Sequence, residues 1–169
     1  MTSRIDPPYE AEEREMLETW LEYHRDTLVW KCDGLTDDQL RERSVPPSSM
    51  SLLGLVRHMA EVERNWFRRV LSNEDAPGIF YSDENPDGDF DDVDSAVVAE
   101  AFAVWTSECD NARKVSARMR LDEFGTRRGE RVTLRWVLVH MIEEYARHNG
   151  HADLIRESID NRVGHDPPR

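Results

Sequence analysis

The sequence predicts an all-α protein: a four-helix bundle with one short extra helix and a long acidic loop between its second and third long helices. Four segments carry apolar residues at the 3.6-residue spacing of a helix that buries one face. Residues that cap helices precede several of these segments, and no segment alternates convincingly as a half-buried strand does. Because 169 residues make one ordinary domain, we expect a single bundle domain over residues 1–169.

The first two long helices are expected at residues 10–33 and 50–71. Gly34 stops the first of them. Thr36 and Gln39 then form a capping box, in which each side chain satisfies a free backbone amide, and this box opens the short helix. The second long helix can be capped by one of three serines, Ser48, Ser49 or Ser51.

The third and fourth long helices are expected at residues 94–119 and 134–158. Asp94 or Ser95 can cap the third helix, and Thr133 can cap the fourth. Together the four segments supply the amphipathic faces that a bundle buries.

Two connections between helices are long. Residues 72–93 are acidic and rich in turn formers, and so long a loop in a small domain is usually functional or mobile. Four apolar residues interrupt it and indicate a lid held against the body: Ile79, Phe80, Tyr81 and Phe90. Residues 121–131 are polar, and Gly125 and Gly129 break any helix there.

The net charge of −13 argues against nucleic acid as a partner, because nucleic-acid affinity comes largely from Lys and Arg. No apolar run approaches the roughly 20 residues that span a bilayer, and the N-terminus lacks the apolar core of a signal peptide. We therefore expect a cytoplasmic protein with no membrane association.

Both cysteines and one histidine of the first helix are predicted to have structural and not catalytic roles. Cys32 and Cys109, the two cysteines, both fall inside expected helices and are predicted to be reduced thiols. His24 lies on the apolar face of the first helix and is predicted to be a packing residue.

One face of the last helix carries His140, Glu144, His148 and His151. Glu144 and His148 lie one helical turn apart, and His58 lies at the edge of the apolar stripe of the second helix. A lone histidine there is usually a hydrogen-bonded core residue, but several such groups on one apolar face are costly to bury without a cation or partners. His58, Glu144 and His148 would supply three ligands from two helices, as a catalytic zinc site needs. His140 and His151 are rival ligands.

Residues 51–67 and 136–153 resemble the two signature helices of the DinB/YfiT-like superfamily, most closely the branch typified by the mini-circle protein. The turn at residues 30–36 resembles that branch as well, so the similarity covers nearly the whole chain. The resemblance implies a four-helix bundle, often dimeric, that holds a divalent metal through one histidine on the second helix and two residues four apart on the fourth.

Carried onto this sequence, those positions are His58, Glu144 and His148. Many members have histidine where this chain has Glu144, but the related mycothiol-dependent maleylpyruvate isomerases resemble it in having glutamate. The resemblance therefore implies a variant ligand, with zinc or nickel as the expected metal. His151 falls one turn past the ligands and is the candidate catalytic residue, a proton shuttle.

The resemblance also implies the chemistry: a small-molecule thiol such as mycothiol or bacillithiol ionises at the metal and attacks an electrophile, for S-transfer or isomerisation. Arg57 or Arg147 could meet a carboxylate of either substrate, although surface ion pairs with acidic neighbours are the favoured interpretation. The same ligands would serve a metal-dependent hydrolase or a non-catalytic, stress-associated metal-binding protein. A homodimer is expected from the resemblance and from five tryptophans, more than a small core hides completely.

Overall fold

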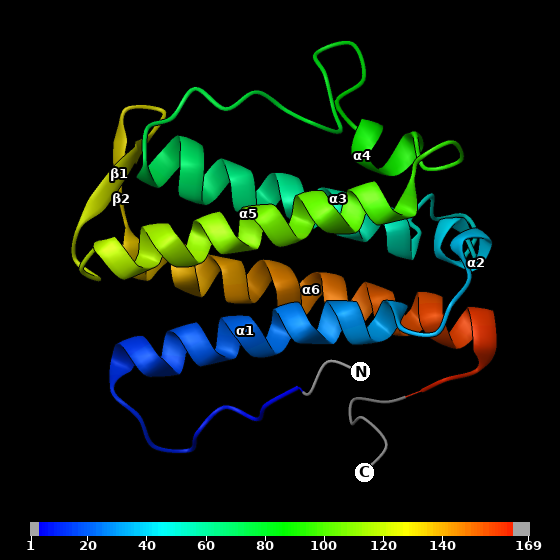
Figure 1. Ribbon diagram of the computed structural model, residues 1–169, viewed down its shortest axis with the longest axis horizontal. Helices are drawn as coiled ribbons and strands as arrows, with labels where there is room; N and C mark the ends of the chain where they lie inside the picture. The colour runs from blue at the N-terminus through cyan, green and yellow to red at the C-terminus, as the bar shows by residue number, and fades with distance from the viewer. Residues whose placement is uncertain (1–3, 164–169) are drawn as a thin grey trace.

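Four long helices make up the bundle in the computed structural model, which describes residues 4–163. They are α1 (Glu13–Cys32), α3 (Leu52–Glu63), α5 (Val98–Arg118) and α6 (Leu134–Asp160). Figure 1 shows α1 beside α6 and α5 beside α3. The all-α prediction is confirmed. The ends of the predicted domain, residues 1–3 and 164–169, lie outside the described residues.

Three of the predicted helix starts are confirmed by hydrogen bonds. Thr36 and Gln39 form the complete capping box of the short helix α2 (Asp37–Arg41). Of the three candidate serines, Ser51 caps α3, and its hydroxyl accepts a hydrogen bond from the backbone N–H of Gly54 at 3.1 Å. Thr133 caps α6 in the same way. Local capping chemistry therefore determines where these helices begin.

The predicted cap of the third helix is wrong. α5 begins at Val98, and its N-cap residue, Val97, makes no side-chain capping bond. Asp94 instead forms an ion pair with Arg43 at 2.7 Å. Val93 is fully buried and fixes the chain before the helix. The turn that follows includes both predicted caps, Asp94 and Ser95, so the helix starts after them.

The second long helix changes its winding midway. After α3, a π-helical segment η1 (Arg64–Leu71) continues the helix, and the backbone N–H of Ser72 bonds to the carbonyl of Phe67, five residues back. The predicted continuous α-helix over residues 50–71 is therefore only partly correct. The eight residues of η1 are too few for the spacing of their buried positions to distinguish an α-helix from a π-helix. π-helical turns are often found at functional sites.

Residues 121–131 contain a feature that the sequence did not predict. β1 (Phe124–Arg127) and β2 (Glu130–Thr133) form a two-stranded antiparallel hairpin. Its two-residue turn is Arg128 and Gly129, both at positive φ, which is the backbone of a tight hairpin turn. Gly129, interpreted as a helix breaker, is in fact the turn glycine.

The hairpin is anchored to η1 through Gly125. A Cβ at this position would lie 1.9 Å from the carbonyl oxygen of Val70 and 2.6 Å from Cα of Leu71. Only glycine permits this approach between two backbones. The hairpin is therefore held in one place on the end of the second long helix.

Replacing Gly125 with alanine should lower the free energy of unfolding by about 1–3 kcal/mol, the usual cost of overpacking. Gly150→Ala is the matched control, because Gly150 is exposed on α6 and a Cβ there has no neighbour within 4 Å. That substitution should stabilise the helix by about 0.5–1 kcal/mol. Urea titrations of both variants measure the difference, and a Gly125→Ala protein as stable as the wild type would show that the anchor is absent.

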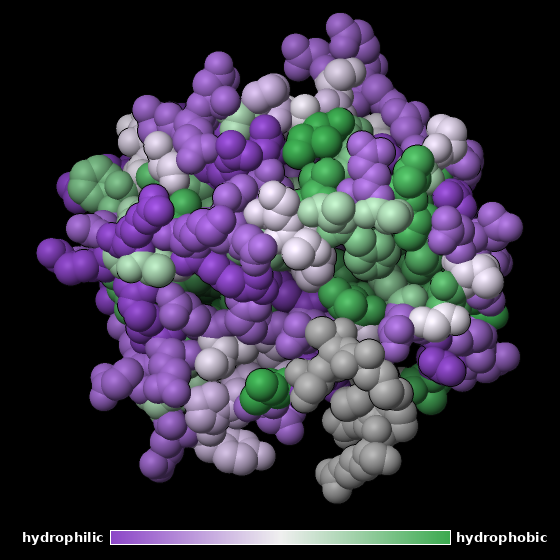
Figure 2. Space-filling view, in the orientation of Figure 1, coloured by the Kyte–Doolittle hydropathy of each residue, from purple (hydrophilic) through white to green (hydrophobic). Residues whose placement is uncertain are grey.

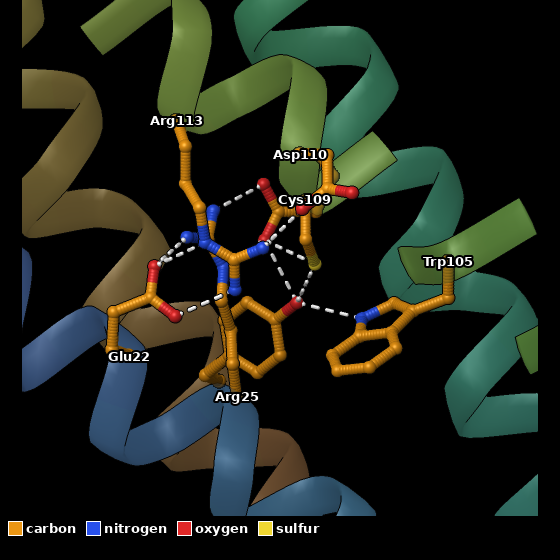
Figure 3. A network of polar contacts seen from close by, with 8 residues as sticks. Glu22, Arg25, Trp105, Cys109, Asp110 and Arg113 are labelled. Carbon is orange, nitrogen blue, oxygen red and sulfur yellow. Dashed lines mark hydrogen bonds and ion pairs between the residues drawn. The ribbon is translucent and has the colours of Figure 1, made fainter. Parts of the chain in front are cut away.

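The bundle core contains a buried polar network that joins all four long helices (Figure 3). At its centre, the fully buried carboxylate of Glu63 accepts two hydrogen bonds from Arg25, at 2.7 and 2.6 Å. Tyr145 donates to the same carboxylate at 2.8 Å, and Trp105 donates to the Tyr145 hydroxyl at 2.9 Å. The Cys109 thiol lies 3.6 Å from Glu63. Each helix thus contributes to one hydrogen-bonded cluster that fixes their relative positions.

The surface is largely polar. Hydrophilic residues cover most of the face in Figure 2, and hydrophobic residues gather in one patch on its right-hand side. Within residues 4–163, no helix combines the length and apolar character needed to cross a bilayer.

Candidate functional site

The three predicted metal ligands come together between α3 and α6. One donor atom from each of His58, Glu144 and His148 lies within 4.8 Å of the other two. His148 Nε2 lies 3.5 Å from a Glu144 oxygen, and the rings of His58 and His148 are 4.7 Å apart. Glu144 and His148 share one helix face because they are four residues apart. The structure thus brings the three predicted residues together.

The hydrogen bonds of the two histidines leave the right atoms free for a metal. His58 Nδ1 bonds to a carboxylate oxygen of Asp89 at 2.8 Å, so its Nε2 is available. His148 Nδ1 lies 3.4 Å from His151 Nδ1, and its Nε2 faces Glu144. Metal-binding histidines are typically held by a carboxylate or another partner in this way. Two imidazole nitrogens and one carboxylate oxygen fit the donor set of a catalytic zinc site.

His148 is suited to metal binding by its protonation state. Burial, together with the nearby imidazoles of His58 and His151, lowers the pKa of His148 to about 4. The ring is therefore neutral at pH 7, and the neutral form is the one that binds metals.

The two rival ligands take different positions. His140 Nε2 lies 3.4 Å from Glu144, and His140 forms a second candidate group with Glu143 and Glu144. That group offers one imidazole and two carboxylates, and Glu143 also pairs with Arg147. His151 belongs to neither group found within residues 4–163 and lies against the Nδ1 edge of His148, away from the edge that faces Glu144. The His58, Glu144 and His148 group is therefore the better candidate for a metal site.

The acidic loop supplies the partner of His58. Asp89 lies in the short helix α4 (Gly88–Asp91), and Arg57 on α3 donates to the carbonyls of Gly88 and Asp89 at 2.9 and 3.0 Å. Phe90 stacks on the His58 ring at 4.9 Å. Asp89 could not be singled out from the sequence because it is one of many acidic residues in this loop, although Phe90 beside it marked an anchored segment.

A second anchor lies further back in the loop. One carboxylate oxygen of the buried Glu61 accepts hydrogen bonds from the backbone N–H groups of Ile79 and Phe80, both at 2.6 Å. The predicted lid is therefore held on α3 at two places, and it forms one wall of the site.

The two arginines considered for substrate binding have partners elsewhere. Arg147 forms an ion pair with Glu143, as the surface interpretation predicts. Arg57 is buried, burial lowers its pKa, and its guanidinium bonds to loop carbonyls rather than to surface carboxylates. His24 is half-buried on α1, where the Asn149 side chain donates to its carbonyl at 3.0 Å, in keeping with a packing role.

An open pocket of about 480 Å³ leads to the site. His58 and Glu144 line it together with Asp89, His140 and Trp66. His140 packs against two indole rings that also contact each other, with ring centroids 4.6 Å from Trp66 and 4.9 Å from Trp136. A small molecule can therefore approach the candidate ligands.

The cysteines of the chain are not available as nucleophiles. Cys32 and Cys109 are both free and buried. Burial raises the pKa of the Cys32 thiol to about 12 and that of the Cys109 thiol further still. Since the thiolate is the reactive form, a thiol that reacts at this site must come from another molecule.

A family model described as mycothiol-S-transferase matches residues 16–161. The chain belongs to the mycothiol-S-transferase family. This family is part of the DinB/YfiT-like superfamily, so the resemblance of the two signature helices is confirmed. No curated protein matches the chain.

The part of the chain that the mycothiol-S-transferase family model matches runs from α1 into the end of α6. It therefore includes all three candidate ligands, His58, Glu144 and His148, as well as Asp89 and His151.

Proposed function

We propose that this member of the mycothiol-S-transferase family transfers the sulfur of a small-molecule thiol, of the mycothiol or bacillithiol type, to an electrophile. In the proposed enzyme, His58, Glu144 and His148 hold one divalent metal ion, zinc or nickel. The observation that carries the proposal is the meeting of these three donor atoms within 4.8 Å beside an open pocket. The match to the mycothiol-S-transferase family is the reason for proposing a thiol of the mycothiol type as the co-substrate.

The proposed reaction forms a carbon–sulfur bond. The thiol loses its proton, and its sulfur attacks an electrophilic carbon. Either a leaving group departs with its electron pair or, at a conjugated double bond, the adjacent carbon takes up a proton. A divalent ion at the site supplies a Lewis acid that lowers the pKa of the thiol.

The side chains around the site orient the proposed ligands, and the burial of both cysteines leaves no thiol of the chain to compete with the added one. Asp89 fixes the orientation of His58, and the neutral His148 presents Nε2 toward Glu144. His151 is the proposed acceptor of the thiol proton, and its 3.4 Å contact with His148 Nδ1 supports a positioning role as well. The buried cysteines leave the added thiol as the nucleophile.

Replacing Asp89 with asparagine should weaken metal binding by about 10- to 100-fold, because second partners of metal-bound histidines commonly contribute that much. Asparagine keeps the shape of the side chain but removes the negative charge beside His58 Nδ1. Competition with a chelator measures the affinity. Asp75→Asn is the control, since Asp75 is an exposed acid of the same loop. Equal metal affinity in the two variants would remove Asp89 from the site.

A metal-dependent hydrolase and a non-catalytic metal-binding protein would use the same ligands. Elemental analysis of protein purified without a metal-affinity tag, followed by assays with mycothiol and a panel of electrophiles, separates the three. Thiol-dependent turnover supports the transferase. Hydrolysis without thiol indicates the hydrolase, and stoichiometric metal without turnover indicates the binding protein.

A homodimer and a cytoplasmic location are part of the proposal. The side chains of Trp20 and Trp136 are 40% and 49% exposed, so the bundle leaves part of its aromatic surface uncovered, as the count of five tryptophans indicated.

A further inference from the structure

The β1–β2 hairpin forms a second pocket, of about 610 Å³, beside the candidate metal site. Three arginines of the hairpin line it, Arg127, Arg128 and Arg131, together with the rings of Trp66 and Trp136. The pocket thus combines positive charge with aromatic walls.

These arginines are unusual in so acidic a protein. Within residues 4–163, only Arg127, Arg128, Arg131 and Arg118 lack a hydrogen bond or ion pair from the guanidinium, although the chain has 35 acidic residues. Arg127 lies over the Trp66 ring at 4.4 Å and Arg131 over a Phe124 ring at 3.5 Å, so aromatic rings hold them instead.

A carboxylate of the chain also lines this pocket but does not neutralise it. Glu130 belongs to the same hairpin, and no ion pair joins it to any of the three arginines among the residues the structure describes. The guanidinium groups therefore keep their donors free for an anion from solution.

The hairpin pocket adjoins the candidate metal site. Arg127 and Trp66 line both the hairpin pocket and the pocket at the candidate site, and His58 and Glu144 line the latter. Gly125 holds the hairpin rigidly against η1, so the position of Arg127 relative to the site is fixed by the fold.

We propose that the hairpin pocket binds the electrophile, and that this electrophile carries a carboxylate next to a flat aromatic or conjugated part. Arg127 and the neighbouring turn residue Arg128 pair with the carboxylate, since a guanidinium matches a carboxylate with two parallel hydrogen bonds. Arg131 lies on the opposite face of the hairpin, over Phe124. The flat part packs against Trp66 and Trp136, which places the reacting carbon toward Glu144. The role of this molecule as the electrophile rests on the proposed function, whereas its binding in the hairpin pocket does not.

The test measures binding by tryptophan fluorescence in chelator-treated protein without thiol, with benzoate as the anionic probe and benzamide as its neutral analogue. Benzoate should bind about 10-fold more tightly than benzamide, in line with the strength of hydrogen bonds to charged groups. Arg127→Gln combined with Arg128→Gln should abolish this preference. Arg118→Gln is the control, because Arg118 is also unpaired but lies at the end of α5, and it should leave the preference intact.

Equal affinity for benzoate and benzamide, or an unchanged preference in the double variant, would overturn the inference. Because the titration needs neither metal nor thiol, it can fail while the proposed transferase stands, and it can succeed if the transferase fails. Where thiol-dependent turnover is found, the double variant should raise KM for a carboxylated electrophile about 10-fold and leave KM for its amide analogue unchanged. A fall in kcat alone would contradict a binding role.

Discussion

Replacing Glu63 with glutamine should lower the free energy of unfolding by about 3–5 kcal/mol, the usual cost of removing one partner from a buried ion pair. Glutamine keeps the volume of the side chain, but it leaves the buried guanidinium of Arg25 with only the half-exposed Glu22 as a charged partner. Tyr145 also loses a charged acceptor. Denaturant titration followed by circular dichroism measures the change.

Two further variants identify the cause of that loss. Glu18→Gln breaks a partly exposed pair with Arg14 and should cost no more than about 1 kcal/mol. Arg25→Met combined with Glu63→Gln removes both charges and should recover most of the stability, because paired removal of buried charges is often nearly neutral. A Glu63→Gln protein within about 1 kcal/mol of the wild type would show that the network contributes little.

Replacing His148 with alanine should reduce the bound metal from one ion per chain to almost none. The substitution removes one of three proposed ligands, so affinity should fall by more than the roughly 100-fold that loss of a supporting partner costs. Elemental analysis after dialysis against a weak chelator measures the metal content.

His151→Ala is the matched comparison for this loss. His151 lies against the far edge of His148, so its removal should leave most of the metal in place and change any activity. If His151→Ala empties the site and Glu144→Ala does not, the ligand set is wrong, and His148 and His151 replace it.

Much of the fold could be predicted because its causes are local. The four long helices follow from apolar spacing. Ser51 and Thr133 mark the starts of two of them, and Thr36 marks the start of the short helix α2, through hydrogen bonds to neighbours in the sequence. The hairpin was missed because its strands have four residues each and owe their position to Gly125 meeting the backbone of η1. Such a contact leaves no periodic pattern.

The same distinction applies to the site. Glu144 and His148 could be paired from their spacing on one helix, and His58 from its place at the edge of the apolar stripe of the second helix. The resemblance to a known superfamily then favoured this set over the rivals His140 and His151. Asp89 could not be selected from an acidic loop without the fold. The network around Glu63 was also missed, because Arg25, Glu63 and Tyr145 meet only when three helices pack together.

The most direct test of the proposed function is the near-ultraviolet spectrum of cobalt-loaded protein during titration with mycothiol. Cobalt substitutes for zinc in sites with imidazole and carboxylate ligands, and a thiolate bound to it gives a charge-transfer band. If His58, Glu144 and His148 hold a metal that receives the thiol, the band should rise to one thiol per metal in the wild type and be absent from His148→Ala. A cobalt spectrum that mycothiol leaves unchanged, or an equal band in His148→Ala, would contradict the proposal.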